Sequence, residues 1–141
     1  MQRAWIEAQQ KETSFKLSKD LRYFDVNKEV TIECDSSDVG LGAVLTQDGC
    51  PVAYASRALT QTERNYAHIE KECLAIVFAA ERFEHYILGK DIVQVLSDHK
   101  PLMSIFGKPI LKSPKRLQRN RLRLQKYPLS GVQAWSSNVH Q

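Results

Sequence analysis

The sequence has few cysteines, and none of them forms a close pair. Cys34, Cys50 and Cys73 are widely spaced, and no CxxC motif occurs. This spacing argues against a zinc cluster and predicts a reduced, intracellular setting, with the compartment left open. No apolar run approaches the roughly 20 residues that a membrane-spanning helix needs. The first residues, MQRAWIEAQQ, are too polar for a signal peptide, so we expect no membrane partner.

Acidic residues are missing from the last third of the chain. All 16 Asp and Glu precede His99, whereas nine of the 20 Lys and Arg lie between Lys100 and Lys126. An acidic body joined to a basic arm is common in proteins that bind nucleic acid. A solvated helix face without a ligand would account for the same charges, so both interpretations stay open.

The composition that remains is that of one globular domain. The chain has 141 residues, of which 43% are apolar and 26% are charged. This length is enough to bury a single hydrophobic core. The composition differs from that of a disordered tail.

Three consecutive strands are predicted in the first half of the chain. Apolar and polar residues alternate over residues 29–35, which is the pattern of a half-buried strand. Residues 40–47 and 51–56 give two more strands, and Asp48-Gly49 between them is a strong signal for a two-residue hairpin. Gly42 indicates a bulge or a close backbone approach. We expect an antiparallel meander.

A long helix and a further strand follow the meander. Thr60 and Glu63 have capping-box spacing, and apolar residues recur every three or four positions over residues 66–87. Gly89 is placed to end this helix in a left-handed conformation. Residues 91–98 are apolar enough for a strand covered on both faces. Strand–helix–strand connections are normally right-handed, so we predict an α/β fold in which parallel strands extend the meander into a mixed sheet.

Three carboxylates are candidates for one site. Asp35 and Asp98 each end a predicted strand, and the carboxyl ends of parallel strands are where open α/β sheets place their sites. Glu72 lies at the rim of the apolar stripe of the long helix. Gathered carboxylates repel one another unless a cation lies among them, and oxygen ligands favour Mg²⁺ or Mn²⁺. Two such ions can promote hydrolysis of a phosphodiester.

Each of these residues also has a plainer interpretation. The two aspartates could cap turns at the ends of their strands, and Glu72 could be one more charge in the run of residues 68–72. We interpret Cys73 as a core residue and His68 as a surface residue. The role of His99 stays open.

A basic helix is predicted near the end of the chain, with Ser113 as its N-cap and Pro114 in its first turn. Several cations on it are spaced three and four residues apart, which places them on one face. Such a stripe can contact phosphates without reading sequence, although a solvated surface is the alternative. The candidate nucleic-acid ligands are Lys115, Arg116, Arg119, Arg123 and Lys126.

Three strings in the sequence, DSSDVGLGAVLTQ, PVAYASRALTQTERNYAHIEKECLAIVFA and LSDHKPL, resemble the ribonuclease H domain of gypsy-type LTR-retrotransposon reverse transcriptases. The resemblance runs from about residue 5 to about residue 127. It implies a ribonuclease H-like fold, with a mixed five-stranded sheet and flanking helices. It also implies Mg²⁺-dependent hydrolysis of the RNA strand of an RNA–DNA hybrid.

The same resemblance assigns roles to the three carboxylates. Asp35 matches the first Asp of the family's "DAS" motif, with Ser36 in place of Ala. Glu72 matches the Glu of the "EKE-LA" motif, and Asp98 matches the Asp of the "TDH" motif. The resemblance therefore implies that Asp35, Glu72 and Asp98 are metal ligands and catalytic residues.

The sequence departs from the family pattern after residue 127. Family domains continue into a fifth strand and a helix that carries a fourth Asp, whereas residues 128–141 contain no carboxylate. We therefore expect the fifth strand and the last helix to be missing or incomplete. We also expect the two-ion site to lack a ligand and hybrid cleavage to be weak or absent.

We divide the chain into a lead from the polymerase connection region (1–25), a ribonuclease H-like domain (26–127) and a divergent, truncated tail (128–141). Two functions follow. The first is a metal-dependent endonuclease that acts on RNA–DNA hybrids beside the remainder of a reverse transcriptase polyprotein. The second is a catalytically silent remnant that only folds or binds nucleic acid.

Overall fold

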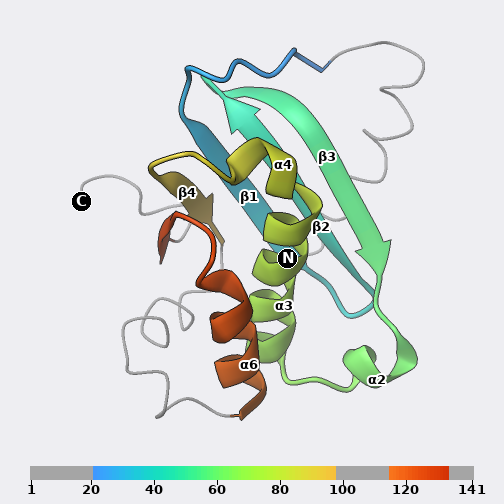
Figure 1. Cartoon of the computed structure of the whole chain (residues 1–141). Coiled ribbons are helices and arrows are strands. Elements are labelled where there is room, and N and C mark those ends of the chain that lie inside the picture. The colour runs from blue at the N-terminus through green and yellow to red at the C-terminus, as the bar shows by residue number, and fades with distance from the viewer. Residues whose placement is uncertain (1–20, 98–114, 134–141) are drawn as a thin grey trace.

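The computed structural model describes residues 21–97 and 115–133. Five strands form one mixed sheet in the order β3-β2-β1-β4-β5 (Figure 1). Their bounds are β1 (Val30–Ser36), β2 (Gly40–Gln47), β3 (Cys50–Ala58), β4 (Val93–Leu96) and β5 (Leu129–Gln133). Strands β1, β2 and β3 form the predicted antiparallel meander, and β4 lies parallel to β1, as predicted.

The β2–β3 hairpin forms through the predicted Asp48-Gly49 turn. Both residues have positive φ angles, 54° for Asp48 and 76° for Gly49. Such angles are required of a turn whose twist matches that of the two strands it joins. The register shift in this hairpin lies between Leu45 and Thr46. The bulge suggested at Gly42 was therefore placed wrongly, because pairing runs through Gly42 without a shift.

The single helix predicted over residues 66–87 is divided into two parts. Helix α3 (His68–Arg82) follows the short helix α2 (Gln61–Arg64), and a non-helical Phe83 separates α3 from α4 (Glu84–Ile87). The predicted capping box is confirmed at α2, where Thr60 Oγ1 accepts from the Glu63 N–H at 3.1 Å. Gly89, with φ of 94°, lies after α4 in the predicted left-handed conformation.

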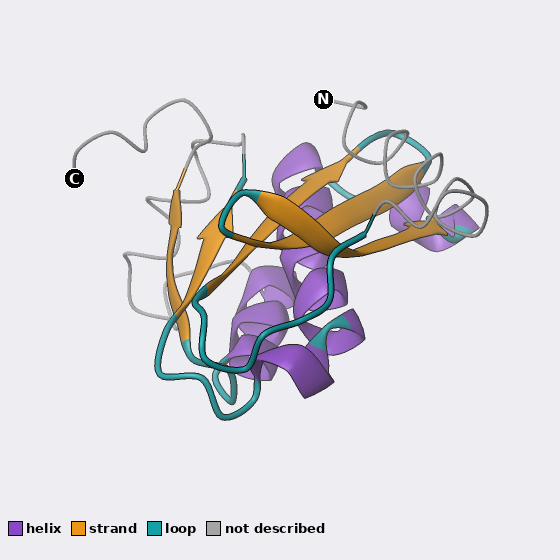
Figure 2. Ribbon diagram, turned by 90° about the horizontal axis from the view of Figure 1, so that it is seen from above, coloured by secondary structure: helices purple, strands orange, loops and turns teal. Residues whose placement is uncertain are grey.

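The core lies between the sheet and the helices on one of its faces. Helix α3 contacts β1 and β2, and α6 (Lys115–Leu124) packs against α3 (Figures 1 and 2). Removing each large apolar side chain from water contributes roughly 1.5–3 kcal/mol. The most completely buried apolar side chains come from both the sheet and the helical segments. They include Ile32, Leu41, Leu45, Ile76, Phe83 and Leu117.

The fifth strand is present, which corrects the expectation that it would be missing or incomplete. Strand β5 pairs in parallel along the whole length of β4, from Val93↔Leu129 to Leu96↔Gln133. Without it, the outer edge of β4 would expose unpaired backbone groups. The register shifts once, between Gln94 and Val95.

Some expectations fall outside the described residues. These are the lead over residues 1–20, Asp98 and His99, the helix start at Ser113 and Pro114, and the family's last helix, which would lie beyond β5. Among the helices that the structure describes, none is long and apolar enough to cross a membrane.

Glu63 joins the meander to the helical layer through Arg57 on β3. The two guanidinium nitrogens donate to the Glu63 carboxylate at 2.8 and 3.1 Å, and this hydrogen bonding lowers the pKa of Glu63. A lowered carboxyl pKa adds stability above the pKa of the unfolded chain. That stability is lost as pH falls through the folded-state pKa.

We therefore expect Glu63→Gln to lower the free energy of unfolding at pH 7 by about 1.5 kcal/mol, because charged hydrogen bonds to Arg57 are lost. The gap between wild type and variant should narrow as pH is lowered toward about 3. Urea unfolding over this pH range measures the gap. Glu29→Gln, at an exposed position, is the matched control. A difference in the free energy of unfolding that does not change with pH would contradict the lowered pKa of Glu63.

Candidate active site

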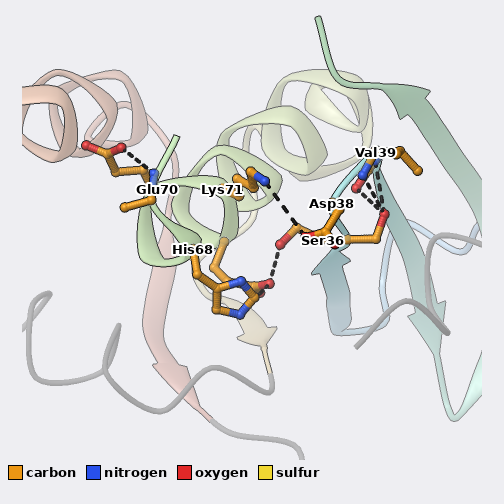
Figure 3. Close-up of polar contacts among 10 residues, drawn as sticks. Ser36, Asp38, Val39, His68, Glu70 and Lys71 are labelled. Carbon is orange, nitrogen blue, oxygen red and sulfur yellow. Dashed lines mark hydrogen bonds and ion pairs between the residues drawn. The ribbon is translucent and has the colours of Figure 1, made fainter. Parts of the chain in front are cut away.

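Glu72 is a fully buried carboxylate that reaches from α3 to the ends of two parallel strands. Its side chain has 0% exposure. The Ser36 hydroxyl at the end of β1 donates to Glu72 Oε2, and the Ser97 hydroxyl just after β4 donates to Oε1 at 3.5 Å. Figure 3 shows Ser36 beside α3. Glu72 thus lies where α3 meets the ends of β1 and β4, whereas the convergence of all three carboxylates stays a prediction.

Asp35 lies on β1 immediately before Ser36 and is 2% exposed. Its Oδ1 accepts the Ser36 backbone N–H at 2.8 Å. Ser36 therefore contacts both carboxylates, Asp35 through its backbone and Glu72 through its side chain. Asp98 lies outside the described residues, and its place in the site stays a prediction.

The donor set fits a hard divalent cation. Asp35 and Glu72 offer carboxylate oxygens, the ligands that Mg²⁺ and Mn²⁺ prefer. Hydrogen bonds from hydroxyls to a ligating carboxylate are typical of the shell that orients metal ligands. Over residues 21–97 and 115–133, no three His, Cys, Asp or Glu side chains are grouped to hold an ion, and the predicted third carboxylate, Asp98, lies outside these ranges.

The turn after Asp35 is held rigidly. Ser37 Oγ accepts the N–H groups of Val39 and Gly40 at 3.2 and 3.0 Å, and the Ser37 N–H donates to the Gly40 carbonyl at 2.9 Å (Figure 3). These contacts satisfy the backbone of the β1–β2 turn from within. These hydrogen bonds support the strand end that carries Asp35.

Two side chains of α3, His68 and Lys71, make ion-pair contacts at this end of the sheet (Figure 3). His68, interpreted from sequence as a surface residue, is half-exposed, and its Nε2 lies 3.8 Å from Glu72 Oε2. Lys71 is nearly buried, with its Nζ 4.0 Å from Asp38 Oδ1. Helical i, i+4 spacing could have indicated the His68–Glu72 pair, whereas nothing in the sequence indicated the Lys71–Asp38 contact.

Cys73 is a core residue, as interpreted from the sequence. It is 0% exposed, and burial raises the pKa of its thiol to about 12. A thiol with so high a pKa carries almost no thiolate at neutral pH. Cys73 therefore supplies packing beside Glu72 and no nucleophile.

Three of the five predicted phosphate-binding cations pair with carboxylates of this chain. Two of these ion pairs join α6 to α3, and the third joins Lys126, which lies just after α6, to α4. Lys115 and Arg119 are exposed and have no ion-pair partner within residues 21–97 and 115–133. The pairs are Arg116–Glu70 at 2.9 Å, Arg123–Glu81 at 2.9 Å and Lys126–Glu84 at 3.2 Å.

The cations of α6 thus fall into two groups: some are paired with carboxylates, and others are exposed. Arg116 also lies over the ring of Tyr66, with its guanidinium carbon 4.1 Å from the ring centroid. A cation held by a carboxylate and an aromatic ring is less available to a phosphate than an exposed one. The nucleic-acid role of the five candidate cations stays a prediction, with the exposed Lys115 and Arg119 as the most accessible of them.

Comparison with known proteins identifies relatives of this chain. Residues 25–127 match the family described as the RNase H-like domain found in reverse transcriptase. The Pol polyprotein of transposon 297 from Drosophila melanogaster is 44% identical over 104 residues, covering 73% of this chain and 9% of the relative. The Pol polyprotein of transposon gypsy from the same organism is 42% identical over 82 residues, covering 58% of this chain and 8% of the relative.

A solved structure shares the fold. The foamy viral protease-reverse transcriptase in complex with RNA/DNA hybrid aligns with 92% of this chain and 19% of its own, with a TM-score of 0.67 and 18% sequence identity. Identity this low shows the fold alone. The chain spans less than a tenth of the curated relatives it matches, so it corresponds to one domain of each. The family match, the gypsy-type relatives and the five-stranded sheet agree, and the chain belongs to the family of RNase H-like domains found in reverse transcriptase.

Proposed function

We propose that this chain is the ribonuclease H domain of a retroelement polyprotein and hydrolyses the RNA strand of RNA–DNA hybrids with divalent metal ions. The observation that carries the proposal is the burial of the Glu72 carboxylate between the ends of β1 and β4. The family itself implies a nuclease. The foamy viral enzyme, whose fold this chain shares, was solved with an RNA/DNA hybrid bound.

Asp35 and Glu72 would hold Mg²⁺ or Mn²⁺, with Asp98 as the predicted third ligand. When bound, such ions activate water and stabilise charge on the leaving oxygen of a phosphodiester. The chain's own contribution is positioning: Ser36 and Ser97 hold Glu72, and the rigid turn over Ser37–Gly40 holds the end of β1. Such preorganisation is worth several kcal/mol in catalysis.

Hybrid binding would involve the exposed cations of α6. Of the five predicted phosphate-binding cations, Lys115 and Arg119 could contact phosphates without first breaking an ion pair within residues 21–97 and 115–133. Backbone contacts of this kind give affinity without sequence preference.

Two further properties are proposals of the same kind. Because the relatives are long polyproteins, we propose that this domain works beside the remainder of a reverse transcriptase. The cysteines described by the structure are all free, which favours a reducing, intracellular setting.

The first test concerns the carboxylates. In Mg²⁺ or Mn²⁺, the wild-type chain should cut the labelled RNA strand of a hybrid, at the low rate that the sequence predicts, and a chelator should abolish the cut. Asp35→Asn and Glu72→Gln should each lower the rate by at least about 100-fold, as losses of electrostatic groups at reacting centres do. Gel analysis of the RNA fragments measures the rate.

Glu29→Gln replaces an exposed carboxylate just before β1, at the other end of the strand from Asp35; it is the matched control and should cut at the wild-type rate. Circular dichroism should show all variants folded. Cleavage that survives both site substitutions would place the activity elsewhere. A folded wild-type chain that neither cuts hybrids nor binds Mn²⁺ would support the silent-remnant alternative.

A second test compares two arginines of α6. Affinity for a hybrid should fall with salt, and losing one phosphate contact should flatten the log–log slope by about 0.9. We expect this change for Arg119→Gln and a smaller one for Arg123→Gln, because Arg123 is held by Glu81. Fluorescence anisotropy at several salt concentrations, with a labelled hybrid, measures both slopes. Equal slopes for both variants and wild type would leave α6 as a solvated surface.

A further inference from the structure

We propose that Ser36 is a positioning residue that fixes the geometry of the two carboxylates Asp35 and Glu72. One residue contacts both of them: its backbone N–H donates to Asp35 Oδ1 at 2.8 Å, and its hydroxyl donates to Glu72 Oε2. Its position in the site is shown in Figure 3. The effect of Ser36 on metal binding rests on the proposed function, whereas its two hydrogen bonds do not depend on that proposal.

Burial makes the Ser36 hydroxyl important for Glu72. Both side chains are 0% exposed. An ionised carboxylate removed from water is costly unless donors replace the lost hydration. Hydrogen bonds to a charged acceptor are stronger than neutral ones. The Ser36 hydroxyl supplies one such donor at Oε2, and the Ser97 hydroxyl supplies a longer one at Oε1.

The position of Ser36 in the sheet makes its link between Asp35 and Glu72 rigid. Ser36 pairs with Leu41 in the β1–β2 ladder, and Asp35 pairs with Gly42. The hydroxyl therefore projects from a paired strand and not from a free loop. A donor on a rigid element limits the rotamers available to the Glu72 side chain, and fixed ligands bind a metal more tightly than mobile ones.

The two contacts of Ser36 can be separated by one substitution, because one comes from its backbone and the other from its side chain. An alanine would keep the backbone contact to Asp35 and would lose the hydroxyl contact to Glu72. Ser36→Ala therefore removes one oxygen atom, leaves the rest of the strand end unchanged and tests the hydroxyl alone.

The experiment measures Mn²⁺ binding to the full chain without nucleic acid, by isothermal titration calorimetry. Substitution of a hydrogen-bond partner of a metal ligand commonly weakens binding 10–100-fold, so we expect Ser36→Ala to raise the Kd about tenfold. Ser36→Thr should restore much of the affinity, and its isostere Ser36→Val should not. Thr46→Val removes a hydroxyl that contacts the Thr31 carbonyl at the other end of β1 and should bind Mn²⁺ like wild type.

The outcomes separate this inference from the proposed function. If Glu72→Gln abolishes Mn²⁺ binding while Ser36→Ala binds like wild type, the positioning role is wrong and the metal site stands. If the wild-type chain binds no Mn²⁺, the proposed function fails, and the contact is then judged by a double-mutant cycle of Ser36→Ala and Glu72→Gln on unfolding in chelator. Coupling between the two positions supports the positioning contact, and additive effects overturn it.

Discussion

The parallel pairing of β1 with β4 is the constraint on which the rest of the structure depends. It aligns Val30 with Val93 and Ile32 with Val95, so both strands end at the same edge of the sheet. Helix α3 connects the meander to β4 and covers β1 and β2. Because the chain must cross the sheet in this way, Glu72 reaches the two strand ends without any special loop. The candidate site is a consequence of topology.

Cations of α6 and of the turn after it form ion pairs within this chain. Arg116 and Arg123 meet carboxylates of α3, and Lys126 meets Glu84 of α4. Exposed pairs of this kind contribute little singly, about 0.2–1 kcal/mol each. Together they join α6 to α3 and the turn after α6 to α4. A phosphate approaching these arginines would compete with carboxylates already in place, whereas one approaching Arg119 would not.

Local patterns in the sequence predicted the parts of the fold that local physics decides. The alternation over residues 29–35, the Asp48-Gly49 turn and the Thr60–Glu63 capping box each depend on residues close in the chain, and each is confirmed. The break at Phe83 was missed because the apolar period continues across it. The strand β5 was missed because its support comes from β4, more than 30 residues away.

The candidate site shows the same division between local and distant causes. That Glu72 faces the helix–sheet boundary was predictable from its place beside Ile69 and Ile76. The hydroxyl contact from Ser36 was not, since it joins residues 36 positions apart and no spacing rule covers such a contact. The partners of the α6 cations were missed for a similar reason: a period of three and four locates the face of a helix but does not say what that face meets.

Glu72 occupies a position where folding alone would favour an apolar residue. Its neighbours Cys73, Ile76 and Val77 are buried in the core, and a carboxylate among them adds desolvation cost that a leucine would avoid. The serine hydroxyls offset part of that cost but add polar groups that must themselves be buried. Residues that break the local rule of an apolar core without helping the fold are the ones expected at functional sites. The arrangement of Ser36, Ser97 and Glu72 is therefore better explained by the proposed metal-binding role of the carboxylate than by a contribution to the stability of the fold.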